Sequence, residues 1–212
     1  GCQDRGREPG GDSHRRFLMK IVGVGCGPGM LTEAAIQTIQ SAHLIIGSER
    51  ALDLAWEYLP ETAEVRTIEN YKKLRTLPDN AVILSTGDPM ISGLGYLGGE
   101  IVPGISSAQL GAAKAGVMLT NLFLITAHGR DYDSAITDCC EMISTNRKVC
   151  IIADPSFPIN KLARMLSLIN PDTQIIVCEN LGYQDERIIY GTAGTPPAPN
   201  SDIFILFIIK AT

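Results

Sequence analysis

The sequence predicts an α/β fold made of two units, and three observations lead to this prediction. Short apolar segments recur along the whole chain, as expected for buried strands. In the first half, segments with helical periodicity separate these apolar segments, and such alternation predicts a parallel sheet. In the second half, the last apolar segments follow one another without an intervening helix. The second unit is therefore predicted to hold a mixed sheet.

The first unit is predicted to span residues 19–120. Residues 1–18 are rich in Gly, Arg and acidic residues and lack apolar periodicity, so we interpret them as a tail outside the fold. Thr32 is expected to cap the first helix, and Pro60 is expected to end the second. In chain order, the predicted elements are strand 20–24, helix 32–42, strand 44–47, helix 49–59, helix 70–76, strand 81–85 and helix 106–115.

The second unit is predicted to span residues 121–212. Its second helix is expected to begin at Pro158, because proline is tolerated in the first turn of a helix. In chain order, the predicted elements are strand 123–126, helix 132–144, strand 148–152, helix 158–168, and strands 174–178, 187–190 and 203–210.

Composition excludes several classes of protein. Of the 212 residues, 45% are hydrophobic and 19% are charged, which is unlike a disordered chain. The net charge of −5 argues against a nucleic-acid partner, since such binding needs a surface that neutralises phosphates. The longest apolar run, at residues 203–209, is too short to cross a bilayer as a helix, so no membrane partner is expected.

The cysteine pattern bears on metal binding and on the cellular compartment. The six cysteines form no CxxC pair, and no histidine lies at a ligand spacing from any of them. We therefore expect no metal site built by the protein. Residues 1–18 also lack the apolar core of a secretory signal, so the expected location is the reducing cytoplasm.

Glycines crowd the loop at residues 23–29, which joins the first predicted strand to the first helix. Glycine lets a backbone turn sharply and approach a ligand closely, so a dinucleotide site is one hypothesis. Pro28 argues against it, because proline stands where the GxGxxG pattern needs glycine and has no N–H for a phosphate. Gly47 and Ser48 stand where an acidic residue should end the second strand. From this loop alone, a nicotinamide or flavin site and a purely structural turn stay open.

Two further segments place polar groups where ligands commonly bind. Gly87-Asp88-Pro89 follows a predicted strand and puts a carboxylate at the carboxyl edge of the sheet, where open α/β sheets bind ligands. Ser106 and Ser107 open an alanine-rich helix, so their hydroxyls and the free helix N–H groups suit a carboxylate. Taken singly, a type I turn explains the first segment and ordinary helix capping explains the second.

The order of these motifs is more specific than any one of them. The glycine loop, Gly-Asp-Pro and Pro-Gly-Ile-Ser-Ser at 103–107 occur with Ser-Ala-His-Leu-Ile-Ile-Gly-Ser-Glu-Arg at 41–50. Ala-His-Gly-Arg-Asp at 127–131 and Glu-Asn-Leu-Gly-Tyr-Gln-Asp-Glu at 179–186 follow. Over residues 19–210 the chain resembles the tetrapyrrole (corrin/porphyrin) methylase family. The last two segments, together with Gly47-Ser48-Glu49-Arg50, are most similar to the branch that methylates carbon 5 of cobalt-precorrin-7.

The resemblance implies two α/β domains with the active site in the cleft between them. It implies that S-adenosylmethionine is the cofactor and that a corrinoid precursor is methylated in cobalamin biosynthesis. It also implies a homodimer, and a separate enzyme that methylates carbon 15 and decarboxylates the ring. No catalytic residue is assigned, because an activated methyl donor depends on placement more than on a general base.

The resemblance also assigns binding residues by position. The corrinoid is a polyanion and this chain is itself negative, so local cations are expected to bind it, and we assign Arg50, His128 and Arg130 to this role. The cofactor-binding residues carried over by motif are Cys26, Gly87, Asp88, Ile91, Ser106, Ser107, Ala153 and Leu181.

One segment departs from the family pattern. Only residues 90–102 stand between Gly-Asp-Pro and Pro-Gly-Ile-Ser-Ser, and four of them are glycines, so a family helix is expected to be shortened or absent here. Alternatives also stay open for the function. They are another precorrin methylase, a diphthine synthase that methylates a protein, a corrinoid-binding module without activity and a nicotinamide-dependent oxidoreductase.

Overall fold

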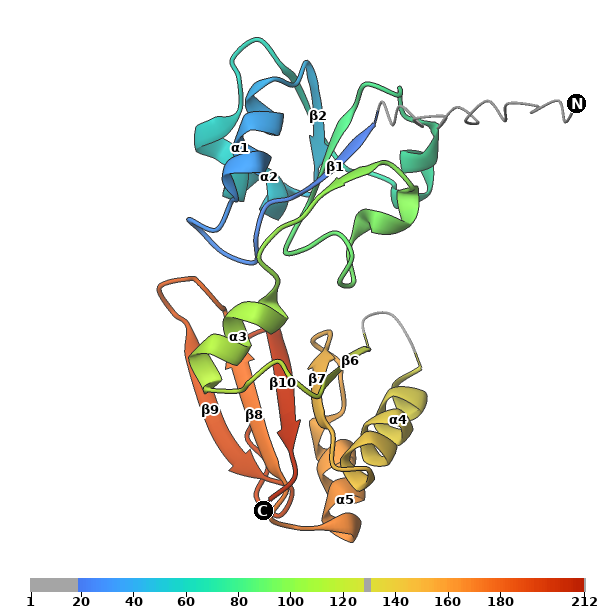
Figure 1. Ribbon diagram of the computed structural model, residues 1–212, viewed down its shortest axis with the longest axis vertical. Coiled ribbons are helices and arrows are strands. Elements are labelled where there is room, and N and C mark those ends of the chain that lie inside the picture. The colour runs from blue at the N-terminus through green and yellow to red at the C-terminus, as the bar shows by residue number, and fades with distance from the viewer. Residues whose placement is uncertain (1–18, 128–130, 212) are drawn as a thin grey trace, which may run out of the picture.

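The computed structural model describes residues 19–127 and 131–211, which form two five-stranded sheets, one in each half of the chain (Figure 1). In the first sheet the order is β3-β2-β4-β1-β5, and every pair of neighbours is parallel. The prediction of a parallel first sheet is therefore confirmed. Its strands are β1 (Lys20–Gly23), β2 (Leu44–Gly47), β3 (Glu64–Thr67), β4 (Val82–Ser85) and β5 (Glu100–Val102).

Two capped helices cover one face of this sheet. The side chains of Thr32 and Ser48 accept the hydrogen bonds that cap α1 (Glu33–Gln40) and α2 (Glu49–Ala55). Both helices pack their buried alanines and Ile39 against β1, β2 and β4. Because β2 and β4 are buried on both faces, they read as continuous apolar runs in the sequence.

The helical prediction was wrong in detail at two places. The α-helical part of the second helix stops at Ala55 and continues as the 3₁₀ helix η1 (Trp56–Tyr58). The predicted helix 70–76 is the 3₁₀ helix η2 (Tyr71–Thr76). As expected, segment 90–102 forms only a short helix, the four-residue 3₁₀ helix η3 (Leu94–Leu97). Four glycines in that segment leave too few helix-forming residues for a longer helix.

The second sheet is mixed, as predicted. Its order is β6-β7-β10-β8-β9, in which β6 and β7 are parallel and the other neighbours are antiparallel. The strands are β6 (Leu122–Thr126), β7 (Lys148–Ile152), β8 (Gln174–Glu179), β9 (Arg187–Thr192) and β10 (Phe204–Ile209). Alternate residues of β7, β8 and β10 face opposite sides, which gives this sheet two separate cores.

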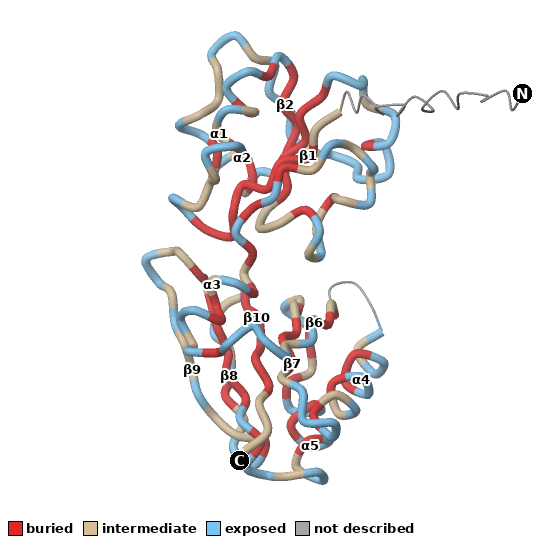
Figure 2. The backbone as a smooth tube through the Cα atoms, viewed as in Figure 1, coloured by how far each residue is buried: buried red, intermediate tan, exposed pale blue. Residues whose placement is uncertain are grey.

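Helices cover both faces of the second sheet (Figure 1). On one face lie α4 (Tyr132–Ser144) and α5 (Ile159–Ile169), which bury Cys139, Leu162 and Leu166. On the other face lies α3 (Ser107–Ala115), which packs against Ile205 and Phe207. Figure 2 shows buried residues in β1 of the first sheet and in α3, β8 and β10 of the second domain.

The place of α3 bears on where the two domains meet. Sequence analysis assigns residues 106–115 to the first unit, yet α3 contacts β8 and β10 of the second sheet. A Cβ added at Gly111 would lie 2.8 Å from the Ile205 side chain, so this contact is close. We propose that the domains join at residues 103–106, ahead of α3, and not near residue 120.

Among residues 19–127 and 131–211, no helix combines the length and apolar character needed to cross a bilayer. No group of three or more His, Cys, Asp or Glu side chains gathers there in a way that would hold a metal ion.

Candidate active site

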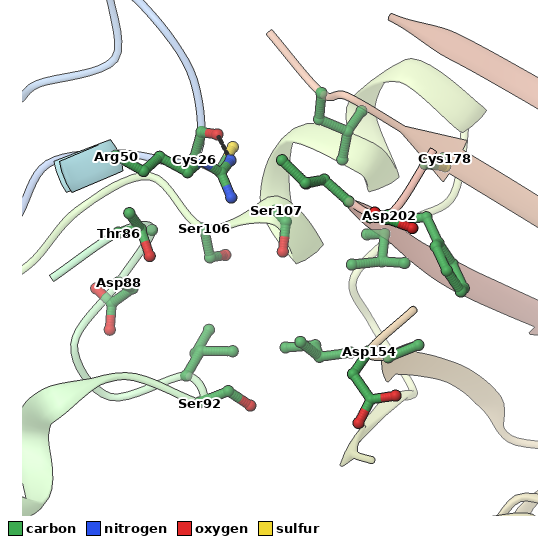
Figure 3. A pocket seen from close by; sticks show the side chains of 18 of the residues that line it. Cys26, Arg50, Thr86, Asp88, Ser92, Ser106, Ser107, Asp154, Cys178 and Asp202 are labelled. Atoms are coloured by element: carbon green, nitrogen blue, oxygen red, sulfur yellow. Dashed lines mark hydrogen bonds between the residues drawn. The ribbon is translucent and has the colours of Figure 1, made fainter. Parts of the chain in front are cut away.

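A cavity of about 260 Å³ lies where loops of the two sheets face each other (Figure 3). Its walls follow the carboxyl ends of β1, β2 and β4 in the first sheet and of β7 and β8 in the second. The loop that enters β10 closes it, because β10 runs antiparallel to its neighbours. Open α/β sheets bind ligands at this edge, so the cavity is the candidate active site.

The structure brings the assigned cofactor residues together. The cavity is lined by Cys26, Gly87, Asp88, Ile91, Ser106, Ser107, Ala153 and Leu181, together with Arg50. In Figure 3, Arg50, Asp88 and Ser106 lie on one side, and Asp154 and Asp202 on the other. His128 and Arg130 lie outside the described residues. Which of these residues touch a ligand stays a prediction.

Backbone contacts explain the glycines of the first motif. A Cβ added at Gly23 would lie 2.6 Å from the Gly104 nitrogen and 2.7 Å from the Gly87 oxygen. The Gly87 N–H also donates to the Gly25 carbonyl at 2.7 Å. The three motif segments therefore touch each other through their backbones, and side chains at these positions would push them apart. This close packing, and not a phosphate loop, accounts for the pattern.

Asp88 holds two of these segments in place. One carboxylate oxygen accepts the Met90 N–H at 2.8 Å, and the other accepts the Gly104 N–H at 3.0 Å. The Ile91 N–H donates to the Asp88 carbonyl at 3.1 Å, which closes the turn that the Gly-Asp-Pro motif predicts. Asp88 thus links the loop after β4 to the segment that leads into α3.

The two serines that open α3 play different structural parts. Ser106 is the N-cap, and its hydroxyl accepts the Gln109 N–H at 3.2 Å in a capping box. The Gln109 side chain in turn accepts the Ser106 N–H at 2.9 Å. Ser107 stands one residue inside the helix, with its side chain at the cavity (Figure 3). Ser107 is therefore the serine that can bind a ligand without giving up a helix cap.

Arg50 meets protein groups in this structure. It lies in the first turn of α2 and is half-buried. Its Nη2 donates to the Cys26 carbonyl at 2.7 Å, and its Nε donates to the Tyr183 hydroxyl at 3.0 Å. From the sequence, the expected partner of Arg50 is a substrate carboxylate. Tyr183 lies 133 residues further along the chain, so no local pattern points to it as a partner.

Sequence reasoning missed several lining residues. Asp154 follows β7 and Asp202 precedes β10, so both stand at the edge of the second sheet that lines the cavity, whereas Asp88 stands at the carboxyl edge of the first sheet. The Tyr132 hydroxyl donates to Asp154 at 2.5 Å. The rule applied to Asp88, a carboxylate directly after an apolar strand, also fits Asp154 and was the available signal. No comparable signal marked Asp202, because its loop reads only as a connection.

A buried carboxylate shapes the loop that carries Asp202. Glu179 is 1% exposed and ends β8. It accepts the backbone N–H groups of Asn200 and Ser201 and forms an ion pair with Arg187 at 3.3 Å. A buried charge needs such partners to offset its desolvation. Glu179 therefore positions the loop that enters β10, and this loop forms one wall of the cavity.

Among the side chains that line the cavity, carboxylates outnumber cations. Three carboxylates, Asp88, Asp154 and Asp202, stand against one guanidinium, that of Arg50. Burial raises the pKa of the Cys26 thiol to about 11, so this thiol stays protonated and uncharged at neutral pH. The arrangement favours a ligand with positive charge at the cavity.

Similar proteins agree with this architecture. The family model for Tetrapyrrole (Corrin/Porphyrin) Methylases matches residues 20–197. A protein of Methanocaldococcus jannaschii named "Probable cobalt-precorrin-7 C(5)-methyltransferase" is 34% identical over 193 residues, covering 78% of this chain and 85% of that protein. The cobalt-precorrin-7 C(5)-methyltransferase of Salmonella typhimurium is 28% identical over 185 residues, covering 81% of this chain and 89% of that protein.

A solved structure supports the same relationship. The precorrin-6Y methylase of cobalamin biosynthesis from Archaeoglobus fulgidus has a TM-score of 0.71 at 28% identity and covers 92% of this chain and 100% of that chain. The family match at residues 20–197 includes the first sheet, all strands of the second sheet except β10, and every motif segment that lines the cavity up to Leu181. The chain therefore belongs to the family of tetrapyrrole (corrin/porphyrin) methylases.

Proposed function

We propose that this chain transfers a methyl group from S-adenosylmethionine to carbon 5 of cobalt-precorrin-7 in cobalamin biosynthesis. The observation that carries the proposal is a cavity at the domain junction that is lined by residues of the glycine loop, the Gly-Asp-Pro turn, the Pro-Gly-Ile-Ser-Ser segment and the segment after β8. The names of the relatives that are 34% and 28% identical support the choice of substrate within the family.

The charge of the cavity suits this donor. S-adenosylmethionine carries a positive sulfonium, and three carboxylates line the cavity against one guanidinium. When bound, it supplies an already activated methyl group. The ring carbon donates the electron pair of the new C–C bond, and the sulfur keeps the pair of the broken C–S bond as a neutral thioether.

The work left to the protein is placement. We assign Ile91, Ser107, Ala153 and Leu181 to hold the donor, because they line the cavity from both domains. Holding two reactants in line replaces a bimolecular encounter and supplies several kcal/mol of the barrier reduction, up to about 7–11 kcal/mol in well-oriented model reactions.

The size of the cavity separates the two ligand sites. Its volume of about 260 Å³ is slightly below the range of small-molecule sites, which span roughly 300–1,000 Å³. A corrinoid macrocycle with its many carboxylate arms does not fit inside it. We therefore place the methyl donor in the cavity and the macrocycle at its mouth.

Incubation with labelled S-adenosylmethionine and a panel of precorrins, with and without cobalt, tests the proposal. We expect one methyl group to be transferred, and its position on the ring, located by NMR, to be carbon 5. Labelling at another carbon would assign a different precorrin methylase, and labelling of a protein instead would assign a diphthine synthase. No transfer to any precorrin would overturn the proposed substrate.

Calorimetry tests the donor separately. S-adenosylhomocysteine, the product of methyl transfer, should bind and raise the melting temperature by mass action, whereas NAD should do neither. Binding of NAD alone would favour the oxidoreductase alternative. Corrinoid binding without S-adenosylhomocysteine binding would favour a module without activity.

A further inference from the structure

A clasp made by Arg50 and Tyr183 joins the two domains beside the cavity. The Arg50 Nη2 donates to the Cys26 carbonyl at 2.7 Å, and its Nε donates to the Tyr183 hydroxyl at 3.0 Å. The guanidinium carbon also lies 5.4 Å from the centre of the Tyr183 ring. One side chain from α2 thus holds the glycine loop of the first domain and the turn after β8 of the second.

The two segments that the clasp joins are packed backbone to backbone. A Cβ added at Gly27 would lie 2.6 Å from the Leu181 carbonyl oxygen. Gly182 has a φ of +83°, and a Cβ added there would lie 2.5 Å from the terminal methyl carbon of Met30. Little space is therefore left for the glycine loop to shift relative to the turn while the clasp is closed.

Both clasped segments form walls of the active site. Cys26 and Leu181 line the cavity, and they share one apolar cluster with Ile205 and Phe207 of the second sheet. The main cores of the domains lie elsewhere, under α1 and α2 in the first and under α4 and α5 in the second. Arg50 therefore sets how two cavity walls meet, while each sheet has a core that does not depend on it.

We propose that Arg50, with Tyr183, is a positioning residue for methyl transfer, which keeps the Cys26 and Leu181 walls in one register across the domain boundary. This inference rests on the proposed function for its kinetic part. The planar guanidinium can make both hydrogen bonds and stack on the ring at once, whereas a lysine ammonium cannot reproduce that geometry. Loss of the clasp leaves the Cys26 carbonyl without this donor and frees a glycine-rich loop.

Kinetics of matched variants test the proposal. Arg50→Lys keeps the charge but breaks the geometry, and Tyr183→Phe removes only the hydroxyl acceptor. The matched control is Arg75→Lys, because Arg75 lies over the Tyr96 ring at 5.6 Å inside the first domain and does not line the cavity. Melting temperature, the affinity for S-adenosylhomocysteine, kcat and KM are measured for each variant.

A positioning role predicts a loss in kcat. Because a shift of about 1 Å in bound geometry can cost 10²-fold in rate, we expect Arg50→Lys to lower kcat by roughly 10–100-fold. The KM for the corrinoid and the melting temperature should change little, and Arg75→Lys should leave kcat unchanged. Tyr183→Phe should lower kcat less, and the double variant should be no slower than Arg50→Lys, since the two residues act as one unit.

Hydrogen exchange supplies a readout that needs no turnover. In Arg50→Lys, the amides of residues 24–30 and 181–186 should both exchange faster than in the unmodified chain, with no such change in Arg75→Lys. If exchange is unchanged in both segments, the clasp does not restrain them and the proposal is overturned. Hydrogen exchange needs no turnover, so it tests the clasp even if no precorrin is methylated. A lack of methylation would overturn only the proposed function.

One kinetic result would give Arg50 a different role. If Arg50→Lys raises only the KM for the corrinoid and leaves kcat and hydrogen exchange intact, Arg50 binds a substrate carboxylate directly. That outcome would overturn the positioning role. The positioning role would be overturned as well if kcat were unchanged in Arg50→Lys, in Tyr183→Phe and in the double variant.

Discussion

At the residue scale, one buried hydroxyl stands out. Thr173 is 0% exposed, and among the described residues its Oγ1 has no hydrogen-bond partner. Its backbone carbonyl is satisfied by the Ala193 N–H at 2.8 Å. An unpaired buried hydroxyl costs free energy because it gives up its hydrogen bonds to water.

Thr173→Val should therefore stabilise the protein. Valine has nearly the same shape without the hydroxyl, so we expect the free energy of unfolding to rise by about 1 kcal/mol. Urea unfolding measures the change. Thr145→Val is the matched control, because the Thr145 hydroxyl donates to the Met142 carbonyl at 2.9 Å and its removal should bring no gain. A loss of stability in Thr173→Val would mean that the hydroxyl is satisfied in solution.

The buried thiols make the stability of the fold decrease at alkaline pH. Burial raises the pKa of the Cys139 thiol well above its usual value of 9.0, so it stays protonated in the folded chain. In the unfolded chain it ionises as the pH passes about 9. The unfolded state then binds fewer protons than the folded state, and stability falls as pH rises.

Removing one such thiol should reduce this pH dependence. We expect the free energy of unfolding of Cys139→Ala to fall less steeply between pH 9 and pH 11, by about 1 kcal/mol per pH unit for the one thiol removed. Below pH 8 the two proteins should show parallel pH dependence, although the variant is less stable throughout. Equal slopes above pH 9 would contradict the raised pKa.

At the scale of elements, the N-terminus of α3 combines a structural and a proposed binding part. Ser106 is buried and caps the helix, whereas Ser107 lies within it at the cavity. The helix in turn packs on β8 and β10, and Lys114 near its end forms an ion pair with Glu186 at 2.7 Å. This hydrogen bond from Lys114 lowers the pKa of Glu186, which also accepts the Gly182 N–H.

Substitution of the two serines should separate these parts. Ser106→Ala removes the cap and should cost about 1 kcal/mol of stability. Ser107→Ala should change stability by less than about 0.5 kcal/mol, as exposed or half-buried substitutions do. If Ser107 binds the donor as proposed, its loss should weaken the binding of S-adenosylhomocysteine by roughly 10-fold, equivalent to one hydrogen bond. Calorimetry in which Ser107→Ala binds normally would remove Ser107 from the site.

At the scale of the whole molecule, the expected homodimer is open to measurement. Four large apolar side chains in and just before the edge strand β6 are 43–67% exposed. They are Met118, Leu119, Phe123 and Leu124. Clustered exposed apolar residues are typical of surfaces that meet another chain. We expect light scattering at micromolar concentration to give twice the mass of one chain. A mass equal to one chain would contradict the homodimer that the family resemblance implies.

Elements with strong local patterns were predicted well. The ranges Leu44–Gly47, Tyr132–Ser144 and Lys148–Ile152 occur as expected, because burial on one or both faces leaves a periodic apolar pattern. The strands β3 and β5 were missed. All four residues of β3 are exposed and β5 has three residues, so neither carries an apolar pattern, and both are strands only because they pair at the sheet edges.

For the candidate site, too, some features follow from local sequence and others only from tertiary contacts. The sequence by itself determined the α/β class, the parallel and mixed sheets, and the motif residues such as Asp88 and Ser107, because periodicity and strand-end position are local properties. Only the tertiary structure decided that α3 packs on the second sheet, that Asp202 reaches the cavity, and that Arg50 bonds Tyr183. These depend on contacts between residues far apart in the chain, which form when the two sheets pack and which no local pattern encodes.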